Sequence, residues 1–189
     1  MKIKTKDLLR DLRKRTLAAN EVVLHLQKSL SETELNYKPD AETWSLLEIT
    51  EHLCRYGDFY LPEAEKRLKA AAPRSAPDYK SGWLGEYFAQ SMLPKNGKIV
   101  NKMNTFKSKN PNGSKIDKQV LDRFLQQQQR LLIILEQAEN YDLSKIKSAT
   151  TIGKLVKIKL GDALRVVVYH IERHILQMQQ REQQIQSVV

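Results

Sequence analysis

Apolar residues recur at spacings of three, four and seven along four long stretches, and this periodicity limits the possible folds more than any other feature. It predicts helices over about 5–30, 45–70, 117–139 and 163–184. Each helix carries one apolar stripe, which must be buried against another element. The chain of 189 residues has only 7 Gly and 6 Pro, which favours helices over turn-rich strands. We therefore expect an all-α fold, a four-helix bundle forming a single domain over 1–189.

Local signals mark the ends of these helices. Ser45 and Glu48 have the spacing of a capping box, in which each side chain satisfies an early backbone amide of the second helix. Asp117 is a plausible N-cap of the third helix, and the pair Gly161–Asp162 is expected to precede the fourth. Pro62 should bend the second helix, because proline lacks an amide donor and clashes with the preceding turn.

The connections between the helices differ in length. Residues 31–44 are short, whereas 73–116 are long and polar, so the bundle need not have simple up-down-up-down topology. Within the long crossover, 83–88 form an apolar island expected to make one or two turns that dock on the bundle. Residues 152–160 are expected to add a short helix. No pair of strands joined by hairpin turn chemistry is expected.

The net charge of +10 is concentrated in three basic blocks, 2–15, 95–118 and 145–159. Such blocks can attract nucleic acid or small anions, or they can be solvated faces and loops. They lack interleaved aromatic residues and a recognition motif, so nucleic-acid binding is not expected. No apolar run is long enough for a membrane span or a secretory signal, and the single cysteine, Cys54, cannot form an intrachain disulfide. We expect a cytoplasmic protein.

Three histidines are placed as ligands of one divalent metal ion. His170 and His174 lie four residues apart, one turn above the other on the same helix face. His52 falls on the apolar stripe of the second helix and faces the bundle interior. Three histidines leave a coordination position open, as in catalytic zinc sites. From the pattern alone the alternative stays open, because exposed histidines four residues apart also arise freely.

Other candidate ligands are excluded by helix geometry. Glu172 lies about 200° around the helix from His170 and points away from the metal face. Cys54 is two residues from His52 and is expected to be a small packed residue. His25 falls on the polar side of the first helix and should be exposed.

Two polar residues are predicted to contact a bound cofactor or substrate. Gln177 lies one turn beyond His174 and could hydrogen-bond a ligand or a metal-bound water, or it could be a polar rim residue. Tyr56 follows His52 by one turn and could line a pocket. Core packing with the hydroxyl at the rim is the alternative for Tyr56 and for Tyr60.

The stretches 35–53, with the run Trp44-Ser45-Leu46-Leu47-Glu48 before His52, and 169–177, Tyr-His-Ile-Glu-Arg-His-Ile-Leu-Gln, resemble the DinB-like (DinB/YfiT) superfamily. The resemblance implies a four-helix bundle with a long crossover, often homodimeric. It also implies a divalent metal, commonly zinc, nickel or iron, on His52, His170 and His174. Characterised relatives include metal-dependent transferases that use low-molecular-weight thiols, and some hydrolases. The family name does not imply DNA binding.

These observations leave two functional hypotheses. The first is a metal-dependent transferase that activates a low-molecular-weight thiol, or a hydrolase, acting on a small molecule. The alternative is a non-catalytic stress-response module that carries a metal or a small ligand. This alternative stays open because no clear general base accompanies the triad of His52, His170 and His174. The role of the basic segment 73–116 stays open.

Overall fold

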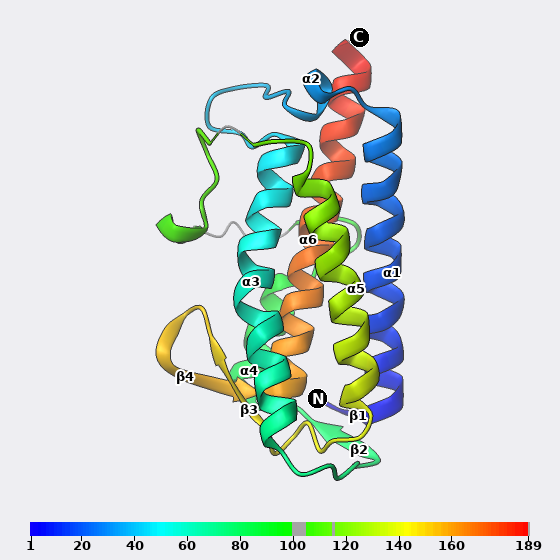
Figure 1. Cartoon of the computed structure of the whole chain (residues 1–189), viewed down its shortest axis with the longest axis vertical. Helices are drawn as coiled ribbons and strands as arrows, with labels where there is room; N and C mark the ends of the chain where they lie inside the picture. The colour runs from blue at the N-terminus through cyan, green and yellow to red at the C-terminus, as the bar shows by residue number, and fades with distance from the viewer. Residues whose placement is uncertain (100–104, 115, 189) are drawn as a thin grey trace.

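The computed structural model describes residues 1–99, 105–114 and 116–188, and most of these residues are helical. Four long helices run side by side (Figure 1): α1 (Thr5–Ser29), α3 (Leu46–Ala70), α5 (Val120–Ala138) and α6 (Leu160–Val188). They correspond to the four predicted helices, and the all-α class is confirmed. None of the helices in the described ranges is both long and apolar enough to cross a membrane.

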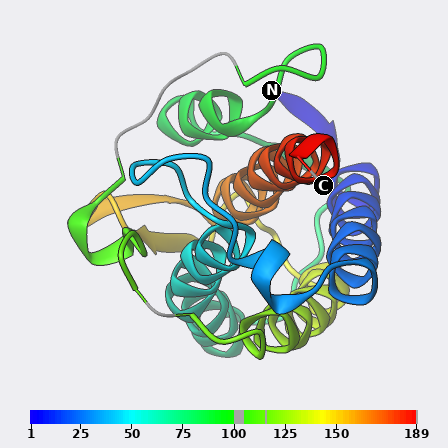
Figure 2. The same ribbon diagram turned by 90° about the horizontal axis from the view of Figure 1, so that it is seen from above.

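The long helices pack in a ring. Helix α3 contacts α5 and α6, and α1 contacts the same two helices (Figure 2). Helices α1 and α6 run in one direction along the bundle, while α3 and α5 run in the other (Figure 1). Because α3 and α5 are parallel, the chain between them must return along the whole bundle, which explains the long crossover.

The apolar stripes predicted from the periodicity form the core. The following residues of α1, α5 and α6 are fully or almost fully buried: Leu12, Val23, Leu26, Phe124, Leu131 and Met178. Their burial supplies most of the stability of such helices, because intrinsic helix propensity alone is marginal.

The crossover holds several short elements. Strand β2 (Asp78–Lys80) pairs antiparallel with β1 (Lys2–Lys4), and α4 (Trp83–Met92) packs against α6. The predicted docking of the apolar island is thus confirmed, although the helix is longer than expected. A short 3-10 helix, η1 (Lys107–Lys109), follows. Of the basic block at 95–118, Lys102 and Lys115 lie outside the described residues.

The prediction for residues 152–160 is wrong. Strands β3 (Lys147–Thr150) and β4 (Gly153–Lys159) form an antiparallel hairpin there, in place of a short helix and against the expectation of no strand pair. Ser148 and Ile158 pair across the hairpin on its buried face, whereas Lys147 and Lys159 pair on the other face. This alternation has the period of two that strands require, and the hairpin gains stability by packing on α3 and α6.

Two predicted helix boundaries differ from the structure. Helix α6 begins at Leu160, directly after β4, so the pair Gly161–Asp162 lies in its first turn and does not precede it. Helix α5 begins three residues after Asp117, whose carboxylate instead accepts a hydrogen bond from the Gln119 amide. Helix α3 is continuous through Pro62. In the first connection, Glu32–Leu35 form the short helix α2.

Candidate metal centre

The predicted capping box positions the first candidate ligand. Ser45 Oγ accepts a hydrogen bond from the Glu48 amide at 3.1 Å, and the Glu48 carboxylate accepts one from the Ser45 amide at 2.9 Å. The buried Glu48 side chain also accepts hydrogen bonds from Lys38 Nζ and the Gly113 amide. The cap therefore fixes the start of α3, so that His52 faces the interior, and ties the crossover to the same helix end.

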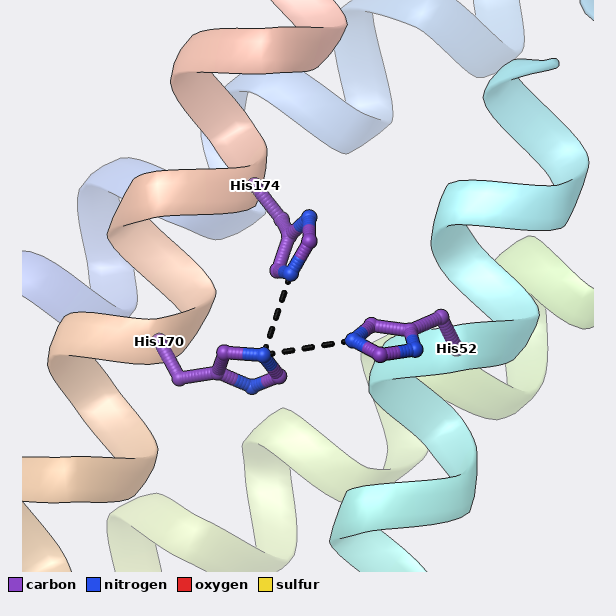
Figure 3. A group of neighbouring side chains, drawn as sticks. All are labelled: His52, His170 and His174. Carbon is purple, nitrogen blue, oxygen red and sulfur yellow. Dashed lines mark hydrogen bonds between the residues drawn. The ribbon is translucent and has the colours of Figure 1, made fainter. Parts of the chain in front are cut away.

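His52 from α3 meets His170 and His174 from α6 in the bundle interior (Figure 3). The Nε2 atom of His170 lies 3.2 Å from Nε2 of His52 and 3.0 Å from Nε2 of His174. The three residues are only 2%, 8% and 6% exposed, in chain order. When histidine, cysteine, aspartate and glutamate are considered among the described residues, these three histidines are the group that could hold a metal ion.

Hydrogen bonds to the outer Nδ1 atoms of His52 and His174 orient the Nε2 lone pairs of these two rings toward His170. Nδ1 of His52 lies 2.8 Å from the Lys109 carbonyl oxygen, and Nδ1 of His174 lies 2.6 Å from Oε1 of Gln177. Since both partners are acceptors, each Nδ1 carries the proton and each Nε2 presents a lone pair. Two lone pairs thus face Nε2 of His170, and a proton there can satisfy only one of them.

A divalent cation at the shared point would satisfy all three nitrogens. Two nitrogens bound at about 2.0–2.1 Å to one ion, at angles between octahedral and tetrahedral, lie about 2.9–3.4 Å apart. The observed separations of 3.0 and 3.2 Å fall in this range. Because all three ligand atoms also lie within 4.8 Å of one another, the three side chains could hold a divalent metal ion.

Burial keeps the three imidazoles in the neutral form that binds metals. It lowers the pKa of His52 to about 4, although the hydrogen bond to the Lys109 carbonyl opposes this shift. Burial also lowers the pKa values of His170 and His174 well below the usual value, and the neighbouring histidines add to the effect. At neutral pH no proton has to be displaced before coordination.

Aromatic rings hold the triad from two sides. The ring of Trp44 lies 4.7 Å from that of His52 and stacks 6.2 Å from that of His174. The ring of Tyr56 lies 4.5 Å from that of His170. Trp44 was not among the residues predicted for the site, although its position immediately before the Ser45 N-cap was an available signal. The Lys109 carbonyl was missed because a backbone atom has no sequence signature.

The triad forms part of the wall of a cavity of about 700 Å³, which is lined mainly by apolar and aromatic residues. Tyr56 and Gln177 both line this cavity, as does Tyr60, whose hydroxyl lies 3.3 Å from Oγ1 of Thr151. Oε1 of Gln177 is also hydrogen-bonded to Nδ1 of His174. Contact of Tyr56 or Gln177 with a cofactor or substrate stays a prediction.

The residues excluded as ligands lie outside the triad. The carboxylate of Glu172 forms an ion pair with Arg15 of α1. Cys54 is fully buried, with Sγ 3.8 Å from the Val120 carbonyl oxygen. The exposed His25 contacts Glu182 at 2.9 Å on the bundle surface. These placements agree with their expected positions on the helices.

The fold and the site together define a helical-bundle protein with a buried histidine cluster able to hold a metal ion. The chain belongs to the DinB superfamily, whose family model matches residues 15–178. This confirms the family assignment suggested by the paired motifs around His52 and His174. Comparison with curated proteins and with solved structures gives no significant match.

Replacing Gln177 by alanine should weaken metal binding about 10- to 100-fold, the usual cost of losing a group that orients a ligand histidine. The amide oxygen holds Nδ1 of His174 at 2.6 Å and thereby fixes its tautomer. Competition with a chromophoric chelator measures the change in Kd. Gln179→Ala, on the exposed side of α6, is the matched control. A Gln177→Ala protein with unchanged Kd would show that the hydrogen bond is dispensable.

Cys54 should be inert in the folded protein. Burial raises the pKa of its thiol to about 12, so the reactive thiolate is scarce at pH 8 and reagents cannot reach it. We expect iodoacetamide to label native protein at least about 100-fold more slowly than urea-unfolded protein, as followed by mass spectrometry. Similar rates in the two states would contradict this burial.

Proposed function

We propose that this protein is a metal-dependent transferase that joins a low-molecular-weight thiol to an electrophilic small molecule. The observation that carries the proposal is the convergence of three neutral imidazoles at the wall of a largely apolar cavity. Three protein ligands leave at least one coordination position for an exogenous group. The cavity of about 700 Å³ has the size of a small-molecule site.

His52, His170 and His174 would hold the ion, which we expect to be zinc, nickel or iron. A divalent ion bound there supplies Lewis acidity that lowers the pKa of a coordinated thiol. The thiol proton passes to solvent, and the sulfur forms a bond to the electrophilic carbon. The bond from that carbon to its leaving group breaks, and the leaving group departs with the electron pair. In an unsaturated carbonyl the carbon–carbon π bond breaks instead, and the resulting enolate takes a proton from solvent.

The protein's own residues position and shield this chemistry. Gln177 and the Lys109 carbonyl hold the outer nitrogens of two ligands, and Trp44 packs against both rings. The apolar cavity wall excludes water, which would compete with the thiol for the electrophile.

The cavity favours thiol transfer over hydrolysis. Hydrolysis gains from a general base beside the attacking water. Among the described residues that line the cavity, Glu42 is the sole carboxylate, and it is exposed on the connection before α3. A metal activates a bound thiol more readily than a bound water, because the free thiol pKa of about 8.5 is far below that of water.

The test is a thiol-consumption assay. Metal-loaded protein is incubated with glutathione, cysteine, bacillithiol or mycothiol and with chloroaromatic, epoxide and unsaturated-carbonyl electrophiles. We expect turnover that a chelator abolishes and added metal restores. Thiol binding without turnover would instead indicate a carrier, and turnover that persists after complete metal removal would exclude the proposed chemistry.

Two further features of the proposal concern the state of the protein in the cell. We propose that it acts as a homodimer and meets its thiol in a reducing cytoplasm. Multi-angle light scattering of the purified protein measures the oligomeric state. A mass equal to one chain of 21.9 kDa would contradict the homodimer.

A further inference from the structure

A second charged group faces the cavity well away from the triad. Arg181 lies on α6 seven residues after His174, which is two helical turns, or about 10 Å along the axis, on the same face. Its side chain lines the same cavity as His174 and Gln177. A ligand in this cavity could therefore contact both the triad and Arg181.

Arg181 lacks the partners that a buried guanidinium normally has. The residue is only 9% exposed, yet its Nε and Nη1 atoms have no hydrogen-bond partner among the described residues. Buried charged groups are ordinarily paired, because desolvation of an unpaired charge is costly. Burial lowers the pKa of Arg181, which shows the same desolvation, but a guanidinium remains protonated at neutral pH.

The acidic side chains nearby do not accept hydrogen bonds from Nε or Nη1 of Arg181. Asp40 is close enough to act on Arg181 electrostatically. However, Oδ1 of Asp40 accepts hydrogen bonds from the amides of Glu42 and Thr43, and Oδ2 accepts one from the Thr43 hydroxyl. Glu42 lines the cavity but is exposed on the same connection. The Nε and Nη1 donors of Arg181, at the wall of the cavity, are thus left without an acceptor among the described residues.

We propose that Arg181 binds a carboxylate of the small molecule whose thiol or electrophilic end occupies the metal centre. This inference rests on the proposed function and narrows its substrate class to acidic compounds. A carboxylate suits the site because it accepts charge-assisted hydrogen bonds from a planar guanidinium. The distance along α6 means that the acidic group and the reacting sulfur or carbon stand at opposite ends of an elongated substrate.

The test compares two thiols that differ only in the far end, 8-mercaptooctanoate and 8-mercaptooctan-1-ol. Protein loaded with Co²⁺ reports binding of each thiol through its sulfur-to-cobalt absorption band. We expect wild-type protein to bind the carboxylate at least tenfold more tightly than the alcohol. Arg181→Gln should lose this preference while its affinity for the alcohol stays the same.

Two control variants separate a specific contact from a general effect of charge. Arg10→Gln removes an exposed positive charge from α1 and should leave both affinities unchanged. Arg181→Lys keeps the charge but not the planar donor group, and should retain only part of the preference. Equal affinities of the two thiols in wild type, or equal loss of both in Arg181→Gln, would overturn the role of Arg181.

If the proposed thiol chemistry is wrong, the cobalt experiment gives a different result from the one expected if only the role of Arg181 is wrong. If neither thiol alters the cobalt spectrum, thiol ligation is wrong, and octanoate then tests Arg181 directly by saturation-transfer NMR. Octanoate binding that disappears in Arg181→Gln supports the carboxylate site independently of thiol chemistry. Absence of octanoate binding to wild type rejects it.

Discussion

Replacing His170 by alanine should abolish stoichiometric metal binding. His170 is the central member of the triad, since its Nε2 atom is the one within 3.2 Å of both other Nε2 atoms. Its loss leaves one ligand on each of two helices. Because changes in groups that merely orient a ligand cost about 10- to 100-fold in affinity, loss of the ligand itself should cost more than about 100-fold. Elemental analysis after dialysis and chelator competition measure the effect.

The matched control for His170→Ala is His25→Ala. His25 lies on the exposed side of α1 beside Glu182, so its removal should leave metal content unchanged. Added metal should raise the Tm of wild type and of His25→Ala but not that of His170→Ala, because only a folded site binds the ion. One equivalent of tightly held metal in His170→Ala would place the centre elsewhere.

Replacing Asp162 by alanine should lower the free energy of unfolding by about 3–5 kcal/mol, as expected when one partner of a buried ion pair is removed. Asp162 and Arg165 are both 0% exposed, and Nη1 of Arg165 lies 3.2 Å from Oδ1 of Asp162. The Asp162 carboxylate also accepts hydrogen bonds from the Ser81 hydroxyl and the Gly82 amide. The substitution therefore removes one of the two carboxylates paired with the buried Arg165, the other being Glu86, and leaves two crossover donors without this acceptor.

The exposed pair of Arg130 and Glu65 provides the control for this effect. These side chains are 43% and 39% exposed, so Arg130→Ala should change the free energy of unfolding by no more than about 1 kcal/mol. Urea denaturation followed by circular dichroism measures both variants. A loss below about 1 kcal/mol in Asp162→Ala would mean that the existing pair with Glu86, or solvent, is enough to satisfy Arg165.

The long helices and the β3–β4 hairpin differed in how well their structure could be predicted from the sequence. Residues such as Leu12 and Leu26 follow a helical period over many turns, and they are buried as expected. In contrast, the β3–β4 hairpin is short, its turn has no asparagine-glycine signal, and its inner face is buried only by contact with the bundle. Short segments of this kind take their structure from tertiary context.

The site shows the same division. The spacing of His170 and His174 predicts one shared face, because a four-residue step along a helix is a local geometric relation. The position of His52 on the apolar stripe of the second helix added the third ligand, the resemblance to the DinB-like superfamily supported it, and membership of that superfamily is confirmed. The burial of all three rings and the convergence of their Nε2 atoms depend on how α3 packs against α6.

Helical periodicity, capping and histidine spacing were thus readable in the sequence, because each arises from residues within a few turns of one another. The orientation of the lone pairs depends on the Lys109 carbonyl, and the cavity and the unpaired donors of Arg181 depend on packing between distant segments. Only the tertiary structure could decide these features, because contacts between residues far apart in the chain have no local signature.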